Sequence, residues 1–204
     1  MKYIIHRGIT SNIIKENTYQ SIKKAIKDKN TVGVEFDIRL TKDSIIVLSH
    51  NSTINFNIIE NMNYLDIIKE KYLTTLDKIL SIDTDKILLI DIKVKNNYKK
   101  FGNILIKYLK DYNRNIYLCS FNKKIIKYLR NKLKYKLSYI LFNYKKTNND
   151  FIMINTNGIS NKKILKIEDK EIFLWTISNN KELNQIKNKF PNINNYYLII
   201  DKEE

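Results

Sequence analysis

The chain has 204 residues, a formal net charge of +16 at pH 7 and a hydrophobic content of 43%. This length predicts one domain, residues 1–204, with a substantial core, and the composition excludes a disordered chain. Lysines supply most of the positive charge and are scattered in short pairs, whereas arginine is rare. Nucleic-acid binders usually cluster their charge and use arginine, so we expect no nucleic-acid partner. The electrostatic field of this positive charge would still attract an anionic substrate.

The cysteine content and the apolar runs indicate the cellular compartment of the protein. Cys119 is the single cysteine, which excludes a disulfide within the chain. No apolar run approaches the roughly 18 residues that a membrane span requires. The first residues lack the layout of a secretory signal peptide, because a short apolar run leads directly into His6 and Arg7. These features predict a cytoplasmic protein without a transmembrane segment.

Short β-branched runs alternate with longer, lysine-rich amphipathic stretches along the chain. Several runs are continuously apolar, as expected for strands that are covered on both faces. We predict eight strands: Tyr3–His6, Val32–Asp37, Lys86–Lys93, Asn115–Ser120, Lys136–Leu141, Phe151–Ile154, Glu171–Ile177 and Tyr196–Asp201. A further run, Ile45–Ser49, is interpreted as an extension of the second strand.

Helices are predicted between these strands from apolar residues at i, i+3 and i+4 spacing. They are Asn17–Lys29, Leu76–Ile82, Asn97–Tyr112, Lys123–Lys134, Lys162–Ile167 and Lys181–Lys189. Either Asn17 or Thr18 could cap the first of them, while Phe142–Asp150 is polar and too short for a full helix. Eight strands alternating with helices predict an α/β fold, a (β/α)8 TIM barrel. Because such barrels typically have about 250 residues, this one would be compact and trimmed.

The side chains best suited to catalysis fall at the ends of the predicted strands. They are His6 and Arg7 after the first strand, Glu35 and Asp37 on the second, His50 after the additional run, and Asp91 and Lys93 on the third. In a barrel, the C-terminal ends of the strands meet at one mouth. The i, i+2 spacing of the acidic pair and of the Asp-Lys pair aims both members of each pair at the same face.

Three carboxylates from neighbouring strands can form an oxygen-rich site for Mg²⁺ or Ca²⁺. A hard cation beside Arg7 and Lys93 suits a phosphate, and two histidines can supply an acid and a base. Each feature alone has an ordinary structural explanation, since a strand-end histidine is usually structural and an Asp-x-Lys motif can be an ion pair. Their conjunction at successive strand ends favours a phosphodiesterase site.

A series of short motifs follows in order along nearly the whole chain. They are His6-Arg7-Gly8, Glu16-Asn17-Thr18, Gly33-Val34-Glu35-Phe36-Asp37 with Thr41-Lys42-Asp43, Val47-Leu48-Ser49-His50, Leu76-Asp77-Lys78-Ile79-Leu80, Asp91-Ile92-Lys93, Ser120-Phe121, Trp175-Thr176-Ile177 and Ile199-Ile200-Asp201. With these motifs the sequence resembles the glycerophosphodiester phosphodiesterases. The resemblance implies a TIM barrel that hydrolyses a glycerophosphodiester to glycerol phosphate and an alcohol with a divalent cation.

The resemblance also implies a role for each matching residue. His6 and His50 would be the acid/base pair, Glu35, Asp37 and Asp91 would hold Mg²⁺ or Ca²⁺, Arg7 and Lys93 would bind phosphoryl oxygens, Trp175 would line the substrate-side wall or the core, and Glu16 would lie at the edge of the metal site. In the family the substrate's own 2-hydroxyl is thought to attack the phosphorus. An attached hydroxyl has a high effective concentration, so it needs only deprotonation and orientation.

Three departures from the family pattern accompany the resemblance. Asn51 stands where the family usually has Asp, Asp91 where it usually has Glu, and Asp201–Glu204 lacks the T-D-x-P pattern and the last helix. The segment Asn51 to Leu73 is also short compared with the capping insertion of many members, which predicts a more open mouth. Two alternatives therefore stay open. One is a non-catalytic, phosphate-binding barrel, and the other is a phospholipase D-like activity on lysophospholipids with contact to a membrane surface.

Overall fold

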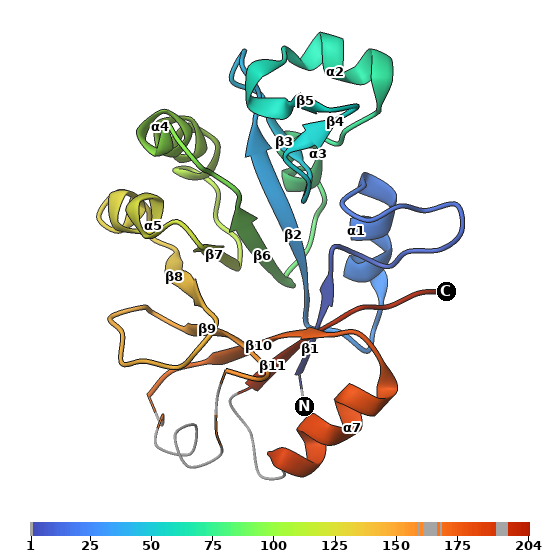
Figure 1. The fold of residues 1–204 in the computed structure, drawn as a ribbon, viewed down its shortest axis with the longest axis vertical. Coiled ribbons are helices and arrows are strands. Elements are labelled where there is room, and N and C mark those ends of the chain that lie inside the picture. Colours follow the sequence, from blue (N-terminus) through green and yellow to red (C-terminus); the bar gives the residue numbers. More distant parts are fainter. Residues whose placement is uncertain (1, 159, 161–166, 168, 191–195) are drawn as a thin grey trace.

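Eight parallel strands close into a ring in the computed structural model, which describes residues 2–158, 160, 167, 169–190 and 196–204 (Figure 1). β1 closes the ring by pairing with β2 on one side and β11 on the other. The strands are β1 Lys2–His6, β2 Gly33–Leu40, β6 Ile87–Ile92, β7 Ile116–Ser120, β8 Lys136–Leu141, β9 Ile152–Asn155, β10 Ile172–Ile177 and β11 Tyr196–Ile200. Each overlaps one predicted strand, so the predicted TIM barrel is confirmed.

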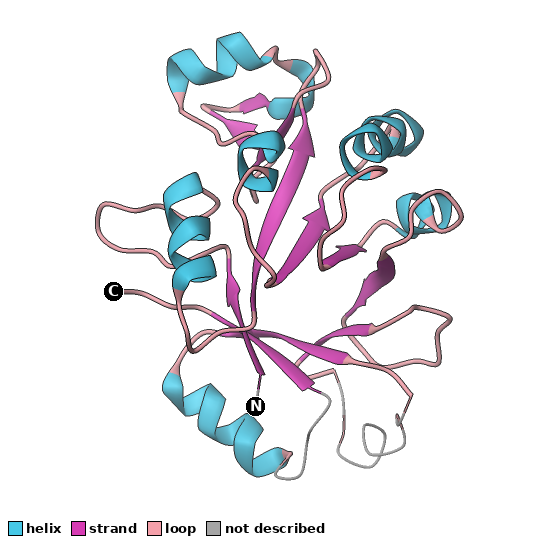
Figure 2. Ribbon diagram, turned by 180° about the vertical axis from the view of Figure 1, so that it is seen from behind, coloured by secondary structure: helices cyan, strands magenta, loops and turns pink. Residues whose placement is uncertain are grey.

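Helices lie outside the ring, with α4 and α5 side by side (Figures 1 and 2). They are α1 Tyr19–Lys27, α3 Leu76–Leu80, α4 Tyr98–Leu109, α5 Lys123–Leu129 and α7 Asn180–Lys189. Thr18, rather than Asn17, caps α1 in a reciprocal capping box with Ser21. The predicted helix 162–167 lies outside the described residues except at Ile167. As expected, residues 142–150 do not form a helix.

Strand residues alternate between the helix layer and the barrel interior. On β2, Val34, Phe36 and Ile38 are fully buried in the cluster that α1, α3, α4 and α5 cover. The intervening Glu35 and Asp37 therefore point inward. A second apolar cluster, made of strand residues and of Phe151 just before β9, fills the interior below these carboxylates: Ile4, Ile87, Leu89, Tyr117, Cys119, Ile140, Phe151, Met153, Phe173, Tyr197 and Ile199. The acidic side chains thus rest on a packed apolar floor.

A polar network sits at the opposite, N-terminal end of the strands. The Glu171 carboxylate accepts hydrogen bonds from the Tyr117 hydroxyl at 2.9 Å and the Tyr197 hydroxyl at 2.9 Å, and from Lys136 Nζ at 2.5 Å. Burial would raise the pKa of Glu171, but the bonds from Lys136 and the two tyrosines outweigh it and lower that pKa. This end of a TIM barrel contributes to stability rather than to chemistry.

Replacement of Glu171 by alanine is expected to lower the free energy of unfolding by about 2 kcal/mol, because three donors lose their common acceptor. Denaturant titration followed by circular dichroism measures the loss. Glu171→Gln retains the shape and part of the bonding, so it should destabilise less. Turnover by the remaining folded protein should be unchanged, since the network lies far from the mouth. A midpoint equal to that of the parent protein would contradict this role.

The segment after β2 differs from the prediction. We interpreted Ile45–Ser49 as an extension of the second strand, but β3, Ile46–Leu48, folds back and pairs with β2 antiparallel.

A small cap follows beyond the end of β2 (Figure 1). It is made of β4 Thr53–Ile54, β5 Asn57–Ile58, the 3-10 turn η1 Ile59–Asn61 and α2 Tyr64–Glu70. The cap has its own apolar core of Val47, Ile54, Ile59, Ile67 and Leu73.

Candidate active site

Strand register brings the predicted acidic residues together at the mouth. His6 lies beside Glu35 across β1 and β2, and Asp37 lies beside Asp91 across β2 and β6. Glu35, Asp37 and Asp91 are all buried, and one carboxylate oxygen of each lies within 4.8 Å of the others. Asp91 reaches this group despite its short side chain, because its strand pairs directly with that of Asp37.

The three carboxylates fit a divalent cation. Mg²⁺ and Ca²⁺ prefer oxygen ligands, and the Asp91 Oδ1 atom is buried without a hydrogen-bond partner in the described part of the chain. A buried, unpaired acceptor costs free energy, and a bound cation would remove that cost.

Two cationic side chains border the carboxylates. Lys93 Nζ lies 3.0 Å from Asp37 Oδ1 and 2.6 Å from Asp91 Oδ2. Arg7 Nε lies 3.1 Å from Asp37 Oδ2, while its Nη1 donates to both carboxylate oxygens of Glu16 at 3.0 and 3.2 Å. Glu16 therefore sits on the outer side of Arg7 and is not a member of the buried carboxylate group. The positive charges of Lys93 and Arg7 offset part of the free-energy cost of burying these carboxylates.

These contacts set the protonation of the three acids differently. Burial would raise the pKa of Asp37, but Lys93 and Arg7 outweigh it and lower that pKa. For Asp91, burial raises the pKa to about 6 despite Lys93. Burial, together with the neighbouring Asp37 and Asp91, raises the pKa of Glu35 well above its usual value. The group therefore holds protons that a cation would displace.

His6 is held between two carboxylates. Its Nδ1 lies 2.6 Å from Asp201 Oδ1, and its Nε2 lies 3.8 Å from Glu35 Oε2. When Asp201 accepts the Nδ1 proton, the tautomer is fixed and Nε2 becomes free to take a proton from a substrate. Burial would raise the pKa of Asp201, but its bond to His6 lowers that pKa, so the acceptor stays ionised.

His50 lies at the same mouth on a loop that Arg39 anchors. Arg39 donates to the His50 carbonyl from Nη2 at 2.8 Å and from Nε at 3.3 Å. The ring Nδ1 lies 3.4 Å from Asn51 Oδ1, so an amide oxygen stands where the family usually has a carboxylate. Burial lowers the pKa of His50, and Arg7 and Lys93 add to this effect while Asp37 opposes it. His50 is therefore neutral at pH 7, the form in which it accepts a proton.

Gly8 explains why the chain turns where it does after His6 and Arg7. Its φ is +84°, and a Cβ at this position would lie only 2.5 Å from the backbone carbonyl carbon of Ser21. Ile9 N donates to the Ser21 carbonyl at 3.0 Å, and Ser21 Oγ donates to the Arg7 carbonyl at 3.2 Å. The close approach to α1 thus positions Arg7.

We expect Gly8→Ala to destabilise the protein by about 2 kcal/mol or more, because left-handed backbone and a backbone clash combine. Thermal unfolding measures this loss, and substrate KM should rise as Arg7 moves. Ser11→Ala, in the same loop, removes side-chain bonds of Ser11 Oγ to its own loop and serves as the control with a small effect. Equal stability of Gly8→Ala and the parent would refute the packing argument.

The remaining predicted residue, Trp175, lines the cavity at the centre of the site. This cavity has a volume of about 100 Å³ and is also lined by His6, Arg7, Glu35, Asp37, His50, Asp91 and Lys93. The Trp175 ring makes edge contacts with Phe121 at 5.8 Å and with Phe142 at 5.6 Å between centroids. All the predicted strand-end residues and Trp175 therefore surround one space.

The sequence analysis did not assign two residues, Asp201 and Asn17, to the site. Asp201, which binds His6, was predicted only as the end of the eighth strand. Asn17 was considered as a helix cap, but its amide donates to Asp37 Oδ2 at 2.9 Å and accepts from Asp37 N at 3.0 Å. A polar residue at a strand end was a usable signal for Asp201, whereas nothing local pointed Asn17 toward Asp37.

The fold and the site together define a TIM barrel with an acidic, histidine-containing site at the C-terminal mouth. A family model described as the glycerophosphoryl diester phosphodiesterase family matches residues 6–189. The chain belongs to this family. It is 31% identical over 141 residues to a protein of Caldanaerobacter subterraneus named glycerophosphodiester phosphodiesterase; the match covers 58% of this chain and 57% of that relative.

Solved structures share the fold at low sequence identity. An Oleispira antarctica phosphodiesterase, in complex with its product sn-glycerol-3-phosphate, superposes with a TM-score of 0.82 at 14% identity over 100% of this chain and 92% of the other. A Thermotoga maritima glycerophosphodiester phosphodiesterase superposes with a TM-score of 0.75 at 21% identity over 98% and 94% of the two chains. In the described part of this chain, no helix combines the length and the apolar character needed to cross a bilayer.

Proposed function

We propose that residues 1–204 form a single phosphodiesterase domain that hydrolyses glycerophosphodiesters to glycerol phosphate and an alcohol. The observation that carries this proposal is the cavity that brings His6, His50 and the three buried carboxylates together. Family membership and the names of the similar proteins support it.

In this proposal Glu35, Asp37 and Asp91 would hold Mg²⁺ or Ca²⁺. The cation would supply positive charge to the phosphoryl oxygens and to the attacking hydroxyl. Arg7 and Lys93 border the same cavity and would bind the remaining phosphoryl oxygens. Arg7 has donors to spare, since its guanidinium carries five N–H groups.

The two histidines would move the protons. One of them removes the proton from the attacking hydroxyl, and the other gives a proton to the oxygen of the leaving alcohol. If the substrate's own 2-hydroxyl attacks, a water molecule then opens the cyclic phosphate and the histidines exchange roles. Overall, the bond from phosphorus to the alcohol oxygen breaks, and one water is consumed. Asp201 orients His6 throughout.

Hydrolysis of glycerophosphoethanolamine and glycerophosphocholine in the presence of Mg²⁺ or Ca²⁺, with release of glycerol phosphate, tests the activity. His6→Ala and His50→Ala variants test the assigned roles. Activity that survives both substitutions would refute those roles. Cation binding without turnover of any diester would instead support a non-catalytic, phosphate-binding barrel.

A second candidate is the related cleavage of lysophospholipids. It is favoured by an apolar shelf beside the cavity, where Phe121 is 44% and Phe142 is 62% exposed, and the two rings stack with centroids 5.1 Å apart. Such a shelf could receive an acyl chain. Release of the headgroup alcohol from lysophospholipid micelles tests this candidate, and Phe142→Ser should reduce that release selectively.

A further inference from the structure

A second cavity opens directly beside the candidate active site. It has a volume of about 600 Å³ and lies between the ends of β2, β6 and β7 and the cap. This volume is within the usual range for small-molecule sites. Lys93 and Phe121 line both this cavity and the central one. A substrate whose phosphate contacts Lys93 can therefore extend into it.

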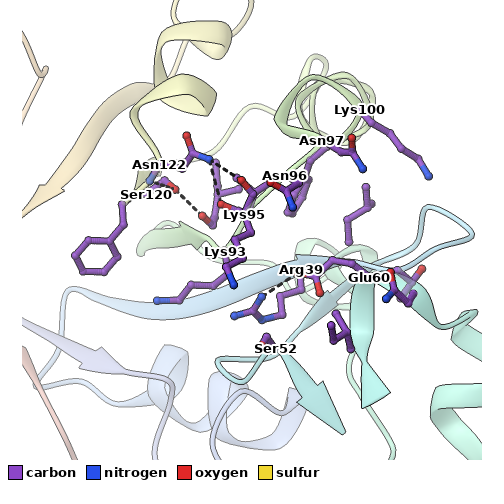
Figure 3. A pocket seen from close by; sticks show the side chains of 18 residues that line it. Arg39, Ser52, Glu60, Lys93, Lys95, Asn96, Asn97, Lys100, Ser120 and Asn122 are labelled. Atoms are coloured by element: carbon purple, nitrogen blue, oxygen red, sulfur yellow. Dashed lines mark hydrogen bonds and ion pairs between the residues drawn. The ribbon is translucent and has the colours of Figure 1, made fainter. Parts of the chain in front are cut away.

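The larger cavity carries an excess of positive charge. Arg39, Lys93, Lys95 and Lys100 line it, and the only acidic side chain among its lining residues is Glu60 (Figure 3). Arg39 Nη1 lies 3.0 Å from Glu60 Oε1 and so neutralises that carboxylate.

Two of the lysines remain available to a ligand. Among the described residues, Lys100 Nζ donates only to the Lys42 carbonyl, at 3.1 Å. Lys95 is exposed, and its ammonium makes no hydrogen bond or ion pair within the part of the chain that the structure describes. An anion in the cavity would meet at least these two uncompensated charges.

Neutral polar groups that suit hydroxyls and anionic oxygens also line the cavity, beside the apolar side chains of Leu40, Ile58, Ile92 and Val94. Asn96 and Asn97 project from the loop after β6, opposite Ser52, which directly precedes the cap (Figure 3). Asn97 precedes α4 and makes no side-chain cap bond, and the first turn of α4 contains no acidic residue, so the positive end of the helix dipole is not offset there. The aromatic lining is limited to buried Phe101 and to Phe121, which is not the aromatic cage that a quaternary ammonium requires.

We propose that this cavity binds the alcohol part of the substrate and selects a polyhydroxylated alcohol that carries a second negative charge. This inference rests on the proposed function, because it places the scissile phosphate at Lys93. It deepens that function by naming the substrate class: anionic polyol diesters are preferred to diesters of choline.

The experiment compares three diesters that differ in the charge of the leaving alcohol: glycerophosphocholine, glycerophosphoglycerol and bis(glycerophospho)glycerol. Per phosphodiester group, kcat/KM is expected to be about tenfold higher for bis(glycerophospho)glycerol than for glycerophosphoglycerol, the combined size of two exposed ion pairs. Glycerophosphocholine should be the poorest substrate. The preference should shrink at high ionic strength, since the lysines are exposed.

A double variant, Lys95→Glu with Lys100→Glu, should abolish the preference for the anionic diester. Lys107→Glu is the matched control, because Lys107 is exposed on the same helix as Lys100 but does not line the cavity. It should leave the preference intact. Thermal unfolding verifies that all variants fold.

Calorimetric binding of the same diesters to the His6→Ala protein repeats the comparison without turnover. Equal affinities and equal kcat/KM values for the two polyol diesters, or a preference for glycerophosphocholine, would overturn the subsite. Tighter binding of bis(glycerophospho)glycerol that Lys95→Glu with Lys100→Glu removes supports the subsite even if no diester is hydrolysed. Binding of this kind without hydrolysis of any diester would overturn the proposed function but not the subsite.

Discussion

His6→Ala should lower kcat on glycerophosphoethanolamine by about a thousandfold, the usual size of a lost acid or base. The side chain lies at the mouth between Asp201 and Glu35, and His6 lines the central cavity. KM should change little, because Arg7 and Lys93 still contact the phosphate. Steady-state kinetics with Mg²⁺ or Ca²⁺ measure both constants. Retention of a tenth of the parent activity would contradict the role of His6.

Asp201→Asn separates orientation from proton transfer. The amide keeps the shape of Asp201 but removes the charge that stabilises the protonated ring and allows the wrong tautomer. We expect a loss in kcat of about a hundredfold, smaller than that of His6→Ala. The pH profile of kcat should shift as well, which a purely structural loss would not produce. If Asp201→Asn changes only the unfolding temperature, Asp201 does not position His6.

The positions of Glu35, Asp37 and Asp91 were predictable because strand alternation is local. Once Val34, Phe36 and Ile38 are assigned to the helix layer, the residues between them must face the interior. The same alternation on β6 places Asp91 inward, between the buried Ile90 and Ile92. A period of two residues therefore determined that these carboxylates face inward, whereas the pairing of β2 with β6 brings them together.

Other parts of the site depend on contacts that no local pattern encodes. Asp201 meets His6 across 195 positions of sequence only because β11 pairs with β1 when the barrel closes. Asn17 reaches Asp37 through a left-handed backbone conformation at φ 55°, in a loop whose composition also suits a helix cap. β3 was misassigned because its apolar run is equally suited to a continued strand and to a strand that folds back.

The lining of the larger cavity could not be predicted from the sequence either, because it depends on contacts between distant segments. Its charged lining comes from Arg39 on β2, Lys95 in the loop after β6 and Glu60 in the cap, three segments far apart in the sequence. In the sequence, Lys95 and Lys100 are part of a general excess of scattered positive charge. The barrel and its cap bring them to one cavity.

A divalent cation should stabilise the protein against heat, and more strongly at pH 8 than at pH 5. In the cation-free protein, burial raises the pKa of Asp91 from 3.8 to about 6. Its contribution to stability is therefore fully present below pH 4 and is lost as the pH rises through 6. A cation held by the ionised carboxylates would reverse this loss of stability in the same pH window. At saturating Mg²⁺ or Ca²⁺ and pH 8, we expect the unfolding temperature to rise by about 5–10 °C.

Asp91→Asn should remove most of this thermal shift and most of the cation-dependent activity, because one of three charged ligands is lost and Asp37 stays paired with Lys93 and Arg7. Asp111→Asn is the matched control, since the Asp111 side chain is 86% exposed and its one ion pair within the described residues is with Lys110, at 3.6 Å. Scanning fluorimetry at pH 5, 6, 7 and 8, with a cation or with a chelator, gives the dependence. A thermal shift of equal size at every pH would mean that the cation binds elsewhere, without displacing the protons that the buried acids hold.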